Sequence, residues 1–220
     1  MSGDAASPDD TQAAIMNATY RALCEHGYAD LTIQTIADEF DKSKSLLYYH
    51  YDTKDEILIG LLDYLLGQFT VRVAIDPPDE ADGLSQPRRP DDPSFVIDPI
   101  DDPPAQLRSF IDELLPASID EDGREFQVAL LELRSQALSN EAYREQFGRA
   151  DRLIQDTLAD VLRSGVEDGS FRDVDVERTV EHLVSTINGA MLQRATTDDD
   201  VTKTREALLA FVDSYILADQ

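Results

Sequence analysis

The chain has 220 residues, enough to bury a sizeable core in one large domain or two small ones. Its 45 acidic and 19 basic residues give a formal net charge of -26, and aspartate outnumbers glutamate by 31 to 14. Because 42% of the residues are hydrophobic, we exclude an acidic disordered chain and interpret the surface as highly hydrated, typical of a halophile. The alternative is an acidic protein with a basic partner, but the negative charge is spread along the whole chain.

Several classes of site are excluded by residue type. The single cysteine, Cys24, rules out an internal disulfide and a CxxC metal site, and we interpret it as a small buried hydrophobe. The three histidines lie in no HExxH motif, and there is no GxSxG, GxGxxG or P-loop sequence. We therefore expect no enzyme, no cofactor and no metal site.

Targeting signals are also missing from the sequence. The first ten residues, MSGDAASPDD, have neither the basic nor the apolar region of a signal peptide. The longest apolar runs, such as residues 57–62, fall far short of the roughly 18 residues of a membrane span. We expect a cytoplasmic protein with no membrane partner.

The N-terminal region predicts short helices. After a flexible segment, residues 1–10, apolar residues recur at helical spacing from Thr11 to Glu25, and Gly27 ends this helix. A second helix covers about Ile33 to Phe40, with Thr32 as its N-cap. A tight turn follows this second helix.

The third predicted helix covers roughly residues 43–51, with Ser43 as its cap. Leu47 and Tyr51 are spaced i, i+4 and should pack inward against the second helix. Two short helices joined by a tight turn indicate helix-turn-helix geometry.

A fourth helix begins after Asp52 or Thr53 and gives way to a proline-rich acidic segment at residues 76–104, predicted to be a long loop. Beyond it the helical pattern resumes at about 105–116, 124–138, 141–167, 174–196 and 201–217. We therefore predict an all-α fold. A three-helix head, residues 11–53, is joined to a helical bundle, residues 54–220.

The outward side of the third helix combines a cation, hydroxyls and phenols. Lys44 and Tyr48 are spaced i, i+4, as are Ser45 and Tyr49, and such groups can reach phosphates and base edges. Three of the four lysines lie within residues 41–56 of an otherwise acidic chain. The alternative is that these aromatics are core and the lysines merely solvated; for His50 both interpretations stay open. The candidate DNA-binding residues are Thr32, Gln34, Ser43, Lys44, Ser45, Tyr48, Tyr49, His50 and Lys54.

The stretch LTIQTIADEFDKSKSLLYYHYDTKDEIL resembles the DNA-binding region of TetR-type transcriptional regulators. The residues that match the motif of that family are Thr32, Ile36, Ala37, Ser43, Leu47, Tyr48, His50, Lys54 and Ile57. The sequence departs from the motif where Asp41 replaces a turn glycine, Lys42 an apolar residue and Ser45 a glycine. We therefore transfer no base preference from the family.

The resemblance implies a homodimer that binds a near-palindromic double-stranded DNA operator. It also implies a small-molecule effector in the bundle that releases the protein from DNA, most often as a repressor. An activator of the same fold is the first alternative, and the second is a helical protein-interaction module without DNA binding. The candidate effector-binding residues are Arg134, Gln136, His182 and Asn188. The candidate dimer interface is Thr186, Gly189, Ala190, Leu208, Phe211, Val212 and Tyr215, an apolar stripe that could equally be intramolecular core.

Overall fold

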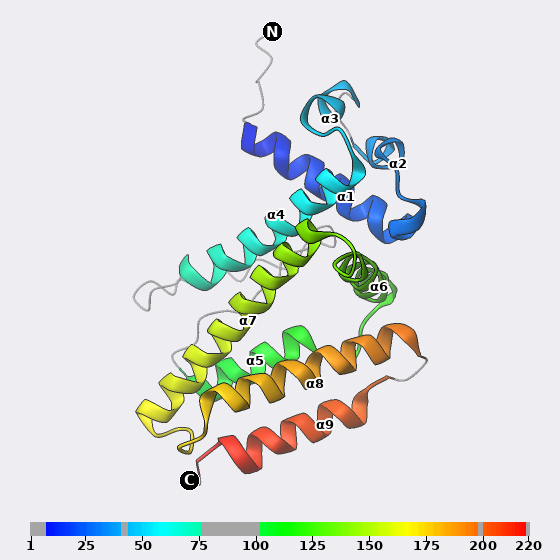
Figure 1. The fold of residues 1–220 in the computed structure, drawn as a ribbon. Coiled ribbons are helices and arrows are strands. Elements are labelled where there is room, and N and C mark those ends of the chain that lie inside the picture. The colour runs from blue at the N-terminus through cyan, green and yellow to red at the C-terminus, as the bar shows by residue number, and fades with distance from the viewer. Residues whose placement is uncertain (1–7, 41–43, 76–101, 198–199, 219–220) are drawn as a thin grey trace.

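A computed structural model describes residues 8–40, 44–75, 102–197 and 200–218, and confirms the all-α prediction (Figure 1). In order, the helices are α1 (Pro8–Asp30), α2 (Ile33–Asp38), α3 (Lys44–His50), α4 (Lys54–Ile75), α5 (Pro103–Leu114), α6 (Glu121–Gln136), α7 (Glu141–Asp168), α8 (Val176–Thr196) and α9 (Thr202–Phe211). A short π-helical turn, η1 (Val212–Ile216), continues α9. None of the described helices combines the length and hydropathy that a membrane span requires.

The helix starts follow from side-chain caps. The Thr32 hydroxyl accepts a hydrogen bond from Thr35 N at 3.1 Å, and the Thr35 hydroxyl accepts one from Thr32 N at 2.9 Å, so a capping box begins α2. Thr53 caps α4 in the same way, because its hydroxyl accepts from Glu56 N at 3.2 Å. Thr32 was predicted as a cap, and Thr53 was one of two predicted alternatives with Asp52. The predicted cap of α3, Ser43, lies outside the described residues.

Three predicted boundaries near the N-terminal helix and the proline-rich segment differ from the structure. Helix α1 begins at Pro8 rather than Thr11, because a proline fits the first turn of a helix, where its missing N–H is not needed. It is broken at Gly27, whose φ of 68° is accessible chiefly to glycine, yet one more helical turn follows to Asp30. Of the segment predicted as a loop, residues 76–101 lie outside the described part of the chain. Its last two prolines, Pro103 and Pro104, form the first turn of α5.

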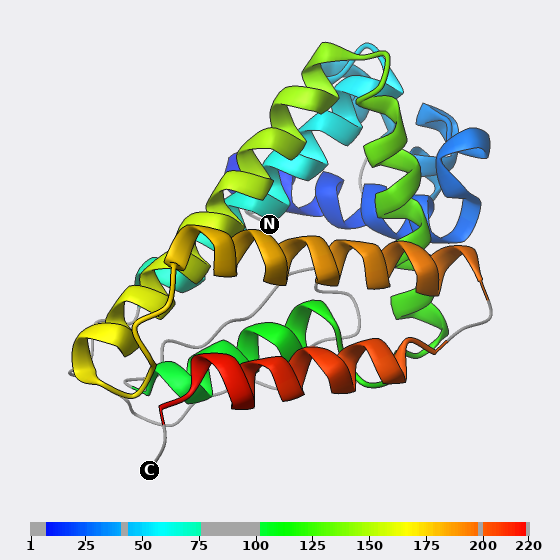
Figure 2. The same ribbon diagram turned by 60° about the horizontal axis from the view of Figure 1, so that its bottom comes forward.

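The head core is not confined to the first three helices. Ile36, Leu47 and Leu58 are fully buried in one apolar cluster that also contains Leu133 of α6 and Tyr143 of α7. The first turns of α4 therefore belong to the head core, although a domain boundary after residue 53 stays a prediction. A second cluster fills the bundle between α5, α7, α8 and α9. Figure 2 shows α5, α8 and α9 side by side, and Figure 1 places them at the end opposite to α2 and α3.

Cys24 lies half-buried against Tyr20 on α1, which agrees with a packing role. Burial raises the pKa of the Cys24 thiol from 9.0 to about 11, so it is protonated and weakly nucleophilic at neutral pH. At pH 8.5 we expect alkylation by iodoacetamide about 100-fold slower than in the unfolded chain, since each pKa unit reduces the thiolate tenfold. Equal rates in the folded and urea-unfolded protein, followed by mass spectrometry, would contradict this burial.

The same shift makes stability depend on alkaline pH. A folded-state pKa above the unfolded value contributes stability in full below pH 9, and this contribution is lost as the pH rises toward 11. A Cys24→Ala variant should show a flatter decline of unfolding free energy over that range.

Candidate functional site

The exposed side of α3 carries the residues predicted to meet DNA. The side chain of Tyr48 is 50% exposed and that of Tyr49 is 81% exposed. Leu47, which directly precedes them, is fully buried in the head core. Lys44, Ser45 and His50 are exposed as well. The His50 ring packs edge-on to Tyr49, with 5.2 Å between ring centroids. Tyr48 and Tyr49, whose burial the sequence left open, are therefore both surface residues. Helix α3 lies at the free end of the head (Figure 1).

The exposed cations and caps of the head already contact other parts of the chain. The Lys44 ammonium pairs with the Asp38 carboxylate on α2, and this hydrogen bond holds the pKa of Asp38 below its ordinary value. The Gln34 amide donates to the same carboxylate at 3.0 Å. Thr32 is exposed, but its hydroxyl and N–H are both used in the capping box. A phosphate would therefore compete with Asp38 for Lys44.

Lys54, at the start of α4, contacts the end of α1. Its ammonium donates to the Tyr28 carbonyl at 2.9 Å and lies 4.2 Å from the centroid of the Tyr28 ring. Lys54 thus ties the start of α4 to the end of α1, and its charge is directed at the head's own backbone. Ser43 lies outside the described residues.

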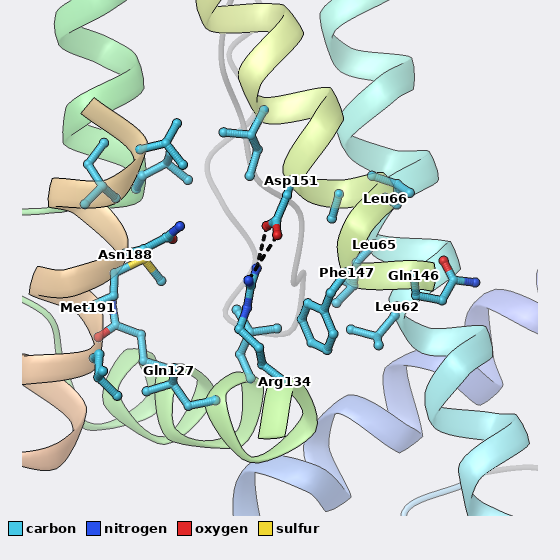
Figure 3. A pocket seen from close by; sticks show the side chains of 18 of the residues that line it. Leu62, Leu65, Leu66, Gln127, Arg134, Gln146, Phe147, Asp151, Asn188 and Met191 are labelled. Atoms are coloured by element: carbon cyan, nitrogen blue, oxygen red, sulfur yellow. Dashed lines mark hydrogen bonds and ion pairs between the residues drawn. The ribbon is translucent and has the colours of Figure 1, made fainter. Parts of the chain in front are cut away.

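A cavity of about 380 Å³ lies where α4, α6, α7 and α8 meet (Figure 3). Its lining is mostly leucine, isoleucine and methionine, which suits an apolar ligand. Arg134 of α6 and Asp151 of α7 face each other across it, joined by two hydrogen bonds of 2.6 and 3.1 Å. The Arg134 guanidinium also lies 4.7 Å from the centroid of the Phe147 ring. Such a bidentate ion pair fixes the orientation of both side chains.

Two of the four predicted effector-binding residues, Arg134 and Asn188, line this cavity. The other two do not line it. The Gln136 amide donates to the Glu132 carbonyl of its own helix at 3.2 Å, and Gln136 is not one of the described lining residues. His182 lies against Phe211 on the α8–α9 side, with ring centroids 4.6 Å apart.

Sequence reasoning missed part of the cavity lining. Gln127, Gln146 and Asp151 contribute polar groups, and Leu62, Leu65 and Leu66 extend the lining onto α4. The leucines recur at helical spacing, a signal that marks a buried face without saying whether side chains or a ligand cover it. The pairing of Arg134 with Asp151 joins residues 17 apart on different helices, which no local pattern predicts.

Family models match two regions of the chain. Residues 15–61 match the N-terminal domain of the bacterial regulatory proteins of the tetR family, and residues 103–218 match the C-terminal domain of BetI-type transcriptional repressors. A TetR transcription regulator from Haloarcula marismortui is 36% identical, with a TM-score of 0.74 over 94% of this chain and 99% of that one. This chain belongs to the TetR family of transcriptional regulators. It is a DNA-binding regulator.

Two further solved structures share the TetR fold at lower identity. A transcriptional regulator from Saccharomonospora viridis in complex with choline is 21% identical, with a TM-score of 0.70 over 96% of this chain and 100% of that one. The fatty acid degradation regulator FadR from Bacillus halodurans is 18% identical, with a TM-score of 0.65 over 95% and 96%. A search of curated protein sequences finds no match. The two likenesses below 25% identity support the fold alone.

In this TetR-family regulator the cavity helices also contact the head directly. The Glu132 carboxylate of α6 accepts a hydrogen bond from Tyr28 N at 2.7 Å, just after the break at Gly27. The Asp55 carboxylate of α4 accepts from the hydroxyls of Tyr28, at 3.2 Å, and Tyr143 of α7, at 3.0 Å. Burial raises the pKa of Tyr143, which keeps its hydroxyl a donor. The end of α1 is thus bonded directly to α6 and α4, and Asp55 links it to α7.

The predicted dimer surface of the TetR-family regulator divides into two sets. Ala190, Leu208 and Val212 are buried in the bundle core of a single chain, so they are not available to a partner, and their assignment is corrected. Their helical stripe is covered by the chain's own helices. The residues of the predicted interface that keep exposed or half-buried surface are Thr186, Gly189, Phe211 and Tyr215.

Proposed function

We propose that this TetR-family regulator is a ligand-responsive repressor that binds a near-palindromic operator as a homodimer. A small molecule in the cavity between α4, α6, α7 and α8 weakens operator binding. The observation that carries this proposal is that α6 contributes both Arg134 to the cavity and Glu132 to the head. A regulator that acts on an operator works where the DNA is, in the cytoplasm.

The DNA-binding surface is the exposed side of α3. Its tyrosines and Lys44 lie on one side of a helix whose opposite side is buried, which suits entry into a major groove. Tyr48 and Tyr49 supply hydroxyl groups that reach phosphates or base edges without a large positive charge. Lys44 is released from Asp38 when a phosphate takes its place.

The dimer forms through α8 and α9, at the end opposite to α3 (Figure 1). Phe211 and Tyr215 stack with ring centroids 4.9 Å apart, and Tyr215 is 49% exposed, so they offer an aromatic patch to a second copy. Thr186 and Gly189 are small enough to permit close approach of that copy. Two-fold symmetry of this contact matches the symmetry of a near-palindrome.

The switch requires only that the ligand binds one head position more tightly than the other. Occupying the cavity moves α6, and Glu132 transmits that displacement to Tyr28 and the end of α1. The Saccharomonospora viridis neighbour holds choline. Here Phe147 is the aromatic ring among the described lining residues and Arg134 already lies over it, so we do not propose a quaternary ammonium as effector.

Filling the cavity by mutation should imitate the effector. Ala150 lines the cavity, so Ala150→Phe places a ring inside it and should weaken operator binding about 10-fold, a typical coupling between two sites. Adding Glu132→Ala should restore most of the affinity, because the bond between α6 and the head is gone. Fluorescence anisotropy with a labelled operator measures both effects.

The matched control for this cycle is Ala142→Phe, a change at an exposed position of the same helix, which should bind the operator as the wild type does. Glu132→Ala alone should change operator affinity only a few-fold. Wild-type affinity in a folded Ala150→Phe variant would show that the cavity does not control the head.

A further inference from the structure

The charge of the cavity restricts the ligand it accepts. Of the described residues that line it, Arg134 and Asp151 are the charged ones, and they neutralise each other through two hydrogen bonds. An anionic ligand must separate Arg134 from Asp151 and then faces that carboxylate, within a chain whose net charge is -26. A cationic ligand finds Asp151 already paired and the face of Phe147 already covered. Both kinds of ion leave one charge of the pair without its partner.

The buried side-chain atoms of the lining that lack hydrogen-bond partners in the described part of the chain are both acceptors. Gln127 is 7% exposed, and its Oε1 atom has no hydrogen-bond partner in the described part of the chain. Rotation about the last bond of the side chain turns this oxygen toward the cavity that Gln127 lines. Gln146 shows the same need: its Nε2 donates to Asp63 at 3.5 Å, while its buried Oε1 is unpartnered within those residues. A buried acceptor is stabilised by a donor brought by the ligand.

We infer that the effector is an uncharged, largely apolar molecule with a hydroxyl or N–H group that donates to Gln127. The apolar lining binds the body of this molecule, and the Arg134–Asp151 pair stays intact at its side (Figure 3). Gln127 lies on α6, the helix that also holds Tyr28 through Glu132, so the donor contacts the element that reaches the head. This inference rests on the proposed function, because it names the ligand of the same cavity.

Four probes with one ten-carbon body test it: 1-decanol, decyl methyl ether, decanoate and decyltrimethylammonium. Their binding to the full chain is measured by isothermal titration calorimetry below their micelle concentrations. We expect decanol to bind at least about 10-fold more tightly than the ether, which lacks a donor, and than either ion. Gln127→Leu should abolish the difference between decanol and the ether. Gln136→Leu, a matched change on the same helix but off the cavity, should leave that difference unchanged.

Three results would overturn the inference: tighter binding of either ion than of decanol, equal binding of decanol and the ether, or binding of none of the four. If decanol still binds more tightly than the ether in Gln127→Leu, Gln127 is not the acceptor of the ligand's donor group. Operator release measured with the same probes separates the two proposals. Decanol that binds but leaves the operator bound would sink the proposed function and support the ligand class. Decanoate that binds best and releases the operator would support the proposed function and overturn the ligand class.

Discussion

Replacing Lys44 and Tyr48 together by alanine should weaken operator binding about 100-fold or more. Both side chains lie on the exposed side of α3, so the variant removes two contacts from each head and four from a dimer. At roughly 0.5–1.5 kcal/mol for each hydrogen bond, four contacts account for about 2–6 kcal/mol. Neither side chain is buried in the head core, so the fold should be retained. Anisotropy titration of a labelled operator measures the affinity, and circular dichroism of the variant measures retention of the fold.

The matched control removes a positive charge elsewhere. Arg163 is exposed on α7 and pairs with Asp160 on its own helix, so Arg163→Ala should bind the operator with nearly wild-type affinity. A comparable loss in Arg163→Ala would mean that overall charge, rather than the exposed side of α3, determines DNA affinity. Wild-type operator affinity in the Lys44/Tyr48 double variant would show that the exposed side of α3 does not contact DNA.

Gly165→Ala should lower the unfolding free energy by about 3 kcal/mol, the upper range for overpacking a core. A Cβ atom at this position of α7 would lie 2.2 Å from Cδ2 of Phe171, and the Phe171 ring is buried in the bundle core. The ring has little freedom to move, because Phe171 N also donates to the Gly165 carbonyl at 2.8 Å and Phe171 bridges to Leu217. Chemical unfolding at constant KCl concentration measures the change.

Gly148→Ala is the control on the same helix. The atom nearest its added Cβ is the end of the flexible Arg152 side chain at 3.4 Å, an ordinary contact. Because alanine forms helices better than glycine, this variant should gain about 0.5–1 kcal/mol. Equal stabilities of the two variants would show that Phe171 does not pack on Gly165.

Local sequence signals were sufficient for most helices. The Thr32 cap and the apolar spacing around Ile36 and Leu47 each act over a few residues, so the chain alone predicts them. Boundaries were less certain. The helical turn after Gly27 is maintained by Glu132, which accepts a hydrogen bond from Tyr28 N, 104 positions away, and no local pattern indicates that contact.

The candidate sites were predictable only in part. The spacing of Leu47 and Tyr51 required at least one of Tyr48 and Tyr49 to be exposed, because adjacent residues of a helix cannot all point inward, and the structure exposes both. By contrast, an apolar stripe such as Leu208 and Val212 has the same spacing whether its own chain or a partner covers it. The phosphate contact of Lys54 stays a prediction, while its hydrogen bond to Tyr28, 26 residues away, is one that no local pattern indicates.

The decisive measurement is a footprint of the purified protein on its own promoter region in molar KCl. An operator-binding dimer predicts protection of a near-palindrome whose half-sites are separated by about 34–36 Å, one helical turn, or a multiple of it. No protection at any KCl concentration, from a protein that is folded and dimeric, would contradict operator binding by the exposed side of α3.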